Sequence, residues 1–344
     1  MRSALVLPFV VLLLARAIPV ASAQEQTNDG GIPEHTRVLD TVVVSGELPG
    51  PGLWKVSKGE HVMWVLGSLS PAPKRMVWRS QSVAAVIAQA DEVLMNGSVD
   101  VSTGKSFFGN LFLVPSMLSA RKNPSKETLK DVVPSELYAR WLVLKKKYLG
   151  RAESVEKRRP IFAAYALYQE AIEKSGLSQD RFVNKVVRKA AKRHKVPITE
   201  PTVKVKLKDP KGMIQEFKKS SLDDVECFAK TLQHLESDLD TMKDRANAWA
   251  TGDIALLQEL SYTDQGQACV TAILENSAMQ SQGLGNLPAQ VKAEWIKAAE
   301  AALTNNRNTF ATLPMAELVE ADGYLAALRS KGYRIEAPTE QDAP

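Results

Sequence analysis

Histidine and cysteine side chains, which commonly perform catalysis or bind metals, are sparse in this sequence. It contains four histidines, His35, His61, His194 and His234, and no two of them lie four residues apart. A zinc-peptidase helix presents two histidines at that spacing, and a serine hydrolase presents G-x-S-x-G at a tight turn; neither pattern occurs. Taken alone, these residues indicate no particular reaction.

The two cysteines, Cys227 and Cys269, are the other candidates for chemistry. Neither is followed by a basic cluster that would activate a thiolate, and two thiols are too few for a structural zinc site. In an oxidising compartment a lone pair of cysteines is expected to form a disulfide. Closing a loop of about 43 residues stabilises a fold by roughly 4 kcal/mol through loop-closure entropy.

The N-terminus has the features of a secretory signal. Arg2 precedes an apolar run from Ala4 to Ala15, and Ala21-Ser22-Ala23 supplies a small-residue cleavage site. As a helix the apolar run would span only about 18 Å, well short of a hydrocarbon core of about 30 Å. We therefore expect residues 1–23 to be a cleaved signal peptide and the mature protein to be periplasmic or secreted.

The remaining chain has the composition of a packed globular protein, with 44% hydrophobic and 24% charged residues. Residues 24–50 are polar and rich in glycine and proline, which predicts a flexible leader before a single domain over 51–340. Loss of Arg2 and Arg16 lowers the net charge from +5 to about +3, which is too weak to indicate nucleic acid binding. No cofactor and no membrane span after signal cleavage are expected.

Local patterns predict mixed α/β structure. Two β-prone runs, 53–56 and 62–66, flank a glycine-bearing turn and predict a hairpin. A helix is expected from Ser80 and a short buried strand at Val93–Met95. The alternating run 202–207 is followed by Asp209-Pro210-Lys211-Gly212, a sequence typical of turns, so a second hairpin returning at Met213-Ile214 is also predicted.

Several short phrases occur along the chain in a fixed order. They are Gly52-Leu53-Trp54-Lys55-Val56, Val65-Leu66-Gly67, Trp78-Arg79-Ser80, Ala90-Asp91, Ala248-Trp249-Ala250-Thr251-Gly252-Asp253, Asp322-Gly323-Tyr324-Leu325 and Lys331-Gly332-Tyr333. In combination they resemble the TraB/GumN family of exported bacterial proteins over most of residues 52–337. This family is similar to TIKI-type proteins, which implies an α+β fold with a mixed β-sheet core and a large helical insertion, here at about 130–305.

The resemblance implies a metal site, because active members are metal-dependent hydrolases, often peptidases. Their expected ligands are a histidine in a G-x-x-H after the first hairpin, a glutamate after the next strand, and a second histidine near the C-terminus. Imidazole and carboxylate groups hold a divalent ion, which acidifies a bound water and polarises a carbonyl. Here those three positions hold Ser70, Asn96 and Glu317. An arginine-asparagine pair falls on Val291-Lys292, and a further acidic position remains as Glu200.

Hydroxyl and carboxamide groups are weak ligands for a divalent transition metal. The sequence therefore predicts no catalytic residues and no metal, with Ser70, Asn96, Glu200 and Glu317 as the remnants of a site. The leading hypothesis is an inactive pseudoenzyme that binds a peptide, a protein or an envelope component. One alternative is a hydrolase rebuilt on Glu317 and Glu200, joined by Asp91.

A second alternative is binding to an anionic surface through a basic helix. The stretch from Lys185 to Lys195 places four cationic side chains on one side of a predicted helix and apolar side chains on the other. The ordinary interpretation of such a stripe is a solvated outer face. The four residues are Lys185, Arg188, Lys189 and Lys192.

Overall fold

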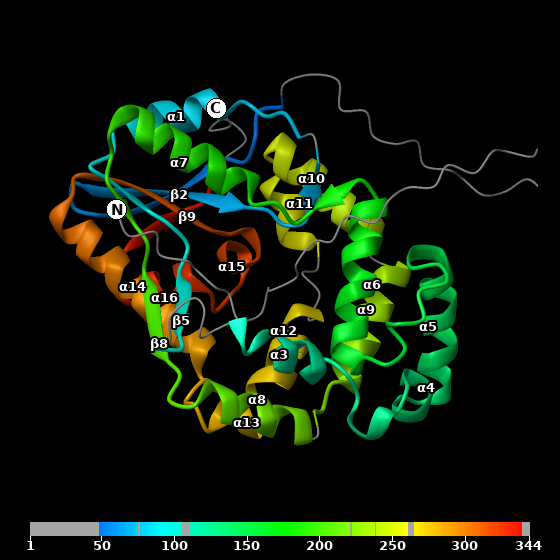
Figure 1. Ribbon diagram of the computed structural model, residues 1–344. Helices are drawn as coiled ribbons and strands as arrows, with labels where there is room; N and C mark the ends of the chain where they lie inside the picture. The colour runs from blue at the N-terminus through cyan, green and yellow to red at the C-terminus, as the bar shows by residue number, and fades with distance from the viewer. Residues whose placement is uncertain are drawn as a thin grey trace, which may run out of the picture.

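The computed structural model describes residues 48–338, apart from 75, 105–110, 221, 238 and 261–264. The expected signal peptide and almost all of the expected leader lie outside these residues. Within them, the largest sheet has the strand order β10-β1-β2-β9-β4-β7 (Figure 1). Its strands are β10 (Arg334–Glu336), β1 (Leu53–Lys58), β2 (His61–Ser68), β9 (Asn308–Pro314), β4 (Glu92–Leu94) and β7 (Ile198–Thr199).

The sheet is mixed, because its first three strands are antiparallel and the rest are parallel. β1 and β2 form the predicted hairpin, with Leu53 opposite Leu66 and Lys58 opposite His61. Gly59 in the turn has a φ of 60°, a conformation that favours glycine. β2, β9, β4 and β7 run parallel to one another, so their carboxyl ends meet at one edge of the sheet.

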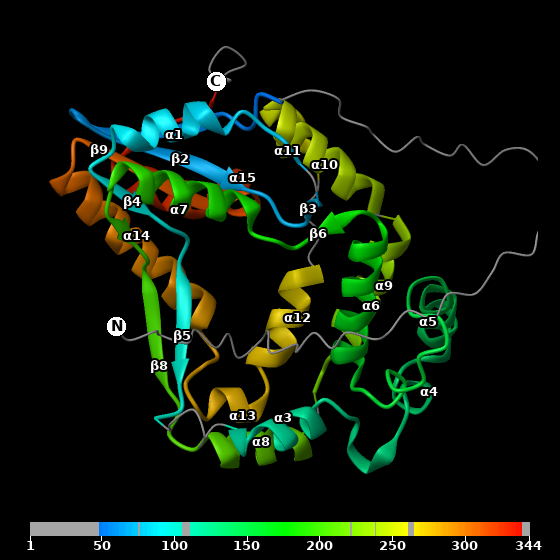
Figure 2. The ribbon, with the colours of Figure 1, turned by 45° about the horizontal axis from the view of Figure 1, so that its top comes forward.

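Helices cover both faces of this sheet, as Figures 1 and 2 show. α1 (Ser80–Ala88) and α7 (Phe182–His194) pack together on one face, and α14 (Leu287–Asn305) and α16 (Tyr324–Ser330) lie on the other. The centre of β9 is buried on both sides for this reason, with Phe310, Ala311 and Thr312 each 0% exposed. The expected α+β fold with a mixed sheet is confirmed.

A two-stranded arm extends from the sheet where a second hairpin was predicted. β8 (Thr202–Lys206) pairs in parallel with β5 (Ser98–Ser102), and the prediction of a return strand at Met213-Ile214 is wrong. That segment lies in α8 (Pro210–Lys219), whose first turn is capped by the Asp209 carboxylate accepting from Gly212 N at 2.9 Å. Proline at the first helical position and aspartate before it favour a helix start as well as a turn.

The remaining helices form a block beside the sheet. Its main core lies among α5 (Ser135–Tyr148), α6 (Pro160–Lys174) and α9 (Val225–Ser237), where Trp141 and Phe228 are fully buried. In the described residues, no helix is long and apolar enough to cross a bilayer. The other elements are α3 (Val114–Ala120), η1 (Pro124–Lys126), α4 (Leu129–Val132), α10 (Leu239–Thr251), α11 (Ile254–Glu259), α12 (Gln265–Leu274), α13 (Ser277–Gln280), α15 (Met315–Val319), β3 (Ala72–Pro73) and β6 (Leu177–Ser178).

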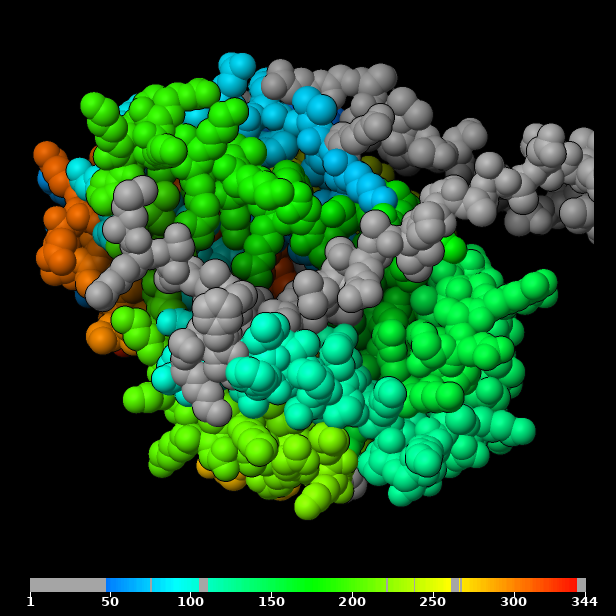
Figure 3. Space-filling view, viewed as in Figure 1, coloured from blue at the N-terminus to red at the C-terminus, as the bar shows by residue number. Residues whose placement is uncertain are grey.

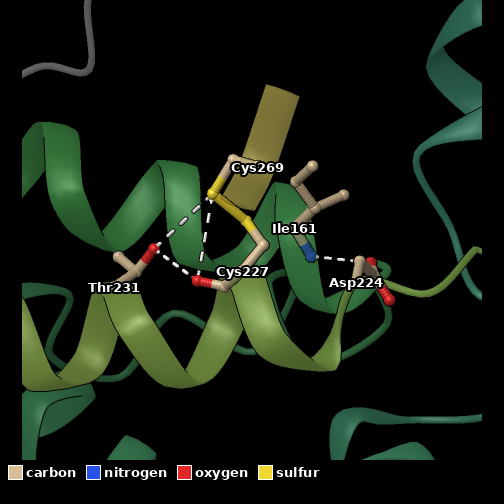
Figure 4. Close-up of a disulfide and its surroundings, with 5 residues drawn as sticks. All are labelled: Ile161, Asp224, Cys227, Thr231 and Cys269. Atoms are coloured by element: carbon tan, nitrogen blue, oxygen red, sulfur yellow. Dashed lines mark hydrogen bonds between the residues drawn. A yellow bond between two sulfur atoms is a disulfide. The ribbon is translucent and has the colours of Figure 1, made fainter. Parts of the chain in front are cut away.

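One disulfide fastens the block. Cys227 of α9 and Cys269 of α12 are joined, with 2.01 Å between the two sulfur atoms (Figure 4). Close by, the Asp224 carboxylate accepts a hydrogen bond of 2.8 Å from the backbone N–H of Ile161 in the first turn of α6. The start of α6 is thereby tied to the residue that precedes α9. Burial raises the pKa of Asp224 to about 6, although the Ile161 N–H and the charge of Arg159 act in the opposite direction.

Candidate functional site

The four positions singled out in the sequence all follow parallel strands at the same edge of the sheet. Ser70 follows β2, Asn96 follows β4, Glu200 follows β7 and Glu317 lies in α15, directly after β9. Carboxyl ends of parallel strands are the usual place for a binding or catalytic site in an open sheet. This edge is therefore the candidate site, and the surroundings of each side chain determine what it can do.

Asn96 is committed to a contact within the protein. Its carboxamide oxygen accepts a hydrogen bond from the Thr312 hydroxyl, at 2.6 Å. Thr312 lies in β9 and is 0% exposed, so this hydrogen bond is shielded from solvent on the Thr312 side. The contact gives a neutral carboxamide a structural reason to occupy this position. Sequence reasoning missed Thr312, because 216 residues separate it from Asn96.

Glu317 faces the layer of helices formed by α14 and α16. Partial burial raises its pKa, the nearby Glu320 carboxylate adds to this, and the positive charge of Lys292 opposes it. Lys292 donates from Nζ to the Asp322 carbonyl oxygen at 2.6 Å and lies 5.6 Å from the centre of the Tyr324 ring. Burial, followed by the charge of Glu317, raises the pKa of Tyr324 to about 12.

The segment where the resemblance led us to expect an arginine-asparagine pair, Val291-Lys292, thus supplies a cation, Lys292, within electrostatic range of Glu317. The carboxyl, the phenol and the ammonium group form one cluster on this side of the sheet. Of these three residues, sequence reasoning gave weight to Glu317 and only loosely to Lys292. Tyr324 belonged to a family phrase but was not recognised as part of the site.

The Glu200 side chain is directed to the opposite face of the sheet from Glu317. Its exposed carboxylate forms an ion pair with Arg188 of α7, which packs beside α1 on the other face of the sheet. Asp91 precedes β4, at the amino end of that strand, and accepts from Asn308 N at 3.0 Å. The structure therefore brings neither Asp91 to the candidate edge nor Glu200 to the helical layer that holds Glu317.

Ser70 lies in an exposed loop between β2 and β3, followed by a cis peptide bond to Pro71. The end of the preceding strand, β2, is fixed by two contacts of Gly67. The Gly67 carbonyl oxygen accepts from the buried Trp249 indole at 2.8 Å, and the side chain of Met315 occupies the space that a Cβ on Gly67 would need. A glycine is required at the end of β2 by this close packing.

A second indole supports the next strand. Trp295 of α14 is 0% exposed and donates to the Met95 carbonyl oxygen at 3.1 Å. Its ring also meets the edge of Tyr324, with 5.2 Å between ring centres. Together with Trp249, it satisfies backbone carbonyls at the carboxyl ends of β2 and β4. The sequence phrases flagged Trp249, but not Trp295 and not the hydrogen bonds that the two indoles make.

The described histidines lie away from this edge. His61 begins β2 and contacts the Asn306 carbonyl oxygen at 2.7 Å, at the amino end of the strand. His234 is buried against Tyr168 in the helical block, and His194 ends α7 in an exposed position. Within the ranges that the structure describes, no three histidine, cysteine, aspartate or glutamate side chains are grouped as metal ligands would be.

The sequence pattern that defines the TraB/PrgY/gumN family matches residues 52–337. The chain belongs to the TraB/PrgY/gumN family. No curated protein and no solved structure matches it. The family match spans the whole described sheet and the helical block, so all four candidate positions fall inside it.

The residues at the candidate edge do not fit the divalent metal that the family resemblance implies. A hydroxyl and a carboxamide replace an imidazole and a carboxylate, and the carboxamide oxygen is already bonded to Thr312. Of the two carboxylates at this edge, Glu200 is paired with Arg188 on the opposite face, and in the described residues Glu317 is not grouped with two further histidine, cysteine, aspartate or glutamate side chains as a metal site would require. We therefore derive no catalytic step through a metal.

Proposed function

We propose that this TraB/PrgY/gumN family member is exported by its signal peptide and acts as a binding or helper protein with no hydrolase activity. The hydrogen bond between Asn96 and Thr312 is the observation that carries the proposal. This hydrogen bond supports a structural role for the sheet edge. The side chain at the position of an expected metal ligand, Asn96, instead links the end of β4 to the neighbouring strand β9. The buried indoles of Trp249 and Trp295 support the same interpretation.

A rebuilt hydrolase is the second candidate, and the raised pKa of Glu317 favours it. A carboxyl group with a raised pKa beside a phenol can act as a general acid or base. A two-carboxylate mechanism needs both groups within roughly 10 Å of each other. The ion pair of Glu200 with Arg188, on the opposite face of the sheet, argues against Glu200 as the partner.

Binding to an anionic surface through α7 remains a separate proposal with less support. Figure 3 shows the side chains of α7 over the upper part of one face of the molecule. Lys185 pairs with Asp180 at 2.5 Å and Arg188 pairs with Glu200, so half of the expected basic stripe is already neutralised by neighbours. Lys189 and Lys192 are exposed. Steep salt dependence of vesicle binding would favour this role.

The test of the proposed function is an activity measurement. Mature protein, residues 24–344, is assayed against a mixture of fluorogenic peptides with Mn²⁺, Co²⁺ or Zn²⁺ and, in parallel, with a chelator. We expect the same background rate in every condition and in the Glu317→Gln variant, because the ligands needed to activate water are missing. A metal-dependent rate that Glu317→Gln abolishes would overturn the proposal in favour of the rebuilt hydrolase.

A further inference from the structure

A cavity of about 530 Å³ lies between the β5–β8 arm and the helical block. It is within the range of roughly 300–1,000 Å³ typical of small-molecule sites. Its walls are mainly apolar and come from elements far apart in the sequence, including Val101 of β5, Met117 of α3, Phe217 of α8 and Ile273 of α12. Such a space favours an apolar ligand, because the ligand would leave water without requiring many polar partners.

The charged side chains among the described lining residues of this cavity are both cationic. They are Arg121, at the end of α3, and Arg181, just before α7. Arg121 also lies close enough to Arg158 to lower its pKa, adding to the larger effect of burial. Arginine presents a planar set of donors suited to carboxylate and phosphate groups. The cavity thus combines apolar walls with a cationic rim.

The cavity also adjoins the candidate edge. Gly97 and Ser98, which follow Asn96, form part of its lining, as does Val291, the neighbour of Lys292. The Val291 side chain packs against Gly97 where a Cβ would otherwise stand, so the two segments are in close contact. A ligand in the cavity would therefore lie beside the candidate edge, without using the residues of that edge as donors.

We propose that this cavity binds a single-chain anionic amphiphile, with the alkyl chain among the apolar walls and a carboxylate or phosphate head group at Arg181, while Arg121 adds a second positive charge to the lining. This assignment rests on the proposed function, since it gives the binding role a ligand class. The volume suits one chain, and the two arginines select the sign of the head group. No residue of the cavity is required to perform a reaction.

The experiment is a calorimetric titration of mature protein with palmitate and with hexadecyl phosphate, each below its micelle concentration. Hexadecyltrimethylammonium, which has the same chain length and a cationic head, is the matched counter-probe. We expect one equivalent of either anion to bind, and the cation to bind at least about tenfold more weakly, because the charged side chains among the described lining residues are both arginines. Comparing carboxylate with phosphate shows which head group the rim prefers.

Variants separate the cavity from nonspecific adsorption. Arg181→Gln is expected to weaken palmitate binding about tenfold, the effect of one charge-assisted hydrogen bond, whereas Arg193→Gln, an exposed arginine of α7 outside the lining, leaves it unchanged. Val101→Trp adds bulk at the wall and should weaken binding at least tenfold in a protein whose melting temperature shows that it folds.

Three results would overturn the inference: absence of binding of both palmitate and hexadecyl phosphate, equal affinity for the cationic probe, or full affinity in a folded Val101→Trp variant. Its failure is distinguishable from failure of the proposed function. Metal-dependent hydrolysis would refute the inactive role even if an anionic probe binds. Absence of hydrolysis together with absence of binding of both anionic probes would refute the ligand assignment alone.

Discussion

Removal of the disulfide between Cys227 and Cys269 is expected to lower the free energy of unfolding by about 4 kcal/mol. The two cysteines are 42 residues apart, and opening a loop of this size restores conformational entropy to the unfolded chain. Loss of the disulfide should also make the wall of the cavity more mobile. Cys269 is in α12, the helix that supplies Ile273 to the cavity wall, so loss of the tether to α9 frees that wall.

The measurement is guanidinium unfolding of wild-type protein, with and without reductant, beside a Cys227→Ala/Cys269→Ala variant. Alanine is chosen because Cys227 is 0% exposed and its site should stay free of polar groups. The double variant should be as unstable as the reduced wild type and should not respond to reductant. Unchanged stability of wild-type protein whose thiols are shown to be fully reduced would refute this expectation.

Asp224→Asn is expected to make the protein progressively more stable than the wild type as the pH rises from 4 to 7. In the fold the pKa of Asp224 is raised to about 6 from 3.8, chiefly because burial disfavours the charged carboxylate. The folded state therefore holds its proton more tightly than the unfolded state. Protonated Asp224 contributes fully to wild-type stability below about pH 4. This contribution to the free energy of unfolding, roughly 3 kcal/mol, is lost as the pH rises through 6.

An asparagine at 224 keeps an oxygen that can accept the Ile161 N–H and carries no proton to lose. The difference in unfolding free energy between variant and wild type should therefore grow by about 2 kcal/mol between pH 4 and 7, as measured by urea unfolding at each pH. Asp223→Asn is the matched control, because that side chain is exposed. A difference that is the same at every pH would show that Asp224 is not the group responsible.

Local features of the fold could be predicted where short-range chemistry decides the outcome. The β1–β2 hairpin follows from two β-prone runs around a turn at Gly59, and both arms lie within sixteen residues of chain. The segment after β8 was ambiguous for a physical reason. Asp209 and Pro210 suit a tight turn and a helix start equally, and only the packing of Met213, Ile214 and Phe217 in α8 decides between them.

Long-range pairings could not be predicted. β5 pairs with β8 across 104 residues, and the Asn96–Thr312 hydrogen bond joins positions 216 residues apart. Neither partner carries a local signal for the other. The metal-site positions implied by the family resemblance did identify residues that the strand order brings to one edge, because those positions follow strands. They gave no information on side-chain direction, so the separation of Glu200 from Glu317 required the structure.

The apolar cavity could not be predicted from the sequence either. Its walls come from the sheet arm, the helical block and α14, and none of these segments is unusual by itself. Its charged rim combines Arg121 and Arg181, which belong to different helical boundaries. A cavity of this kind remains where side chains from separate elements do not fill the space between them. Local sequence patterns carry no information on this long-range packing.

The central claim is that the carboxyl edge of the sheet does not bind a catalytic metal, and the metal content of the mature protein tests it most directly. The protein is dialysed against micromolar Mn²⁺, Co²⁺ or Zn²⁺, then against metal-free buffer, and analysed by elemental mass spectrometry beside the Glu317→Gln variant. We expect far less than one metal per chain in both proteins. One tightly held metal per chain in the wild type, lost in Glu317→Gln, would contradict the claim.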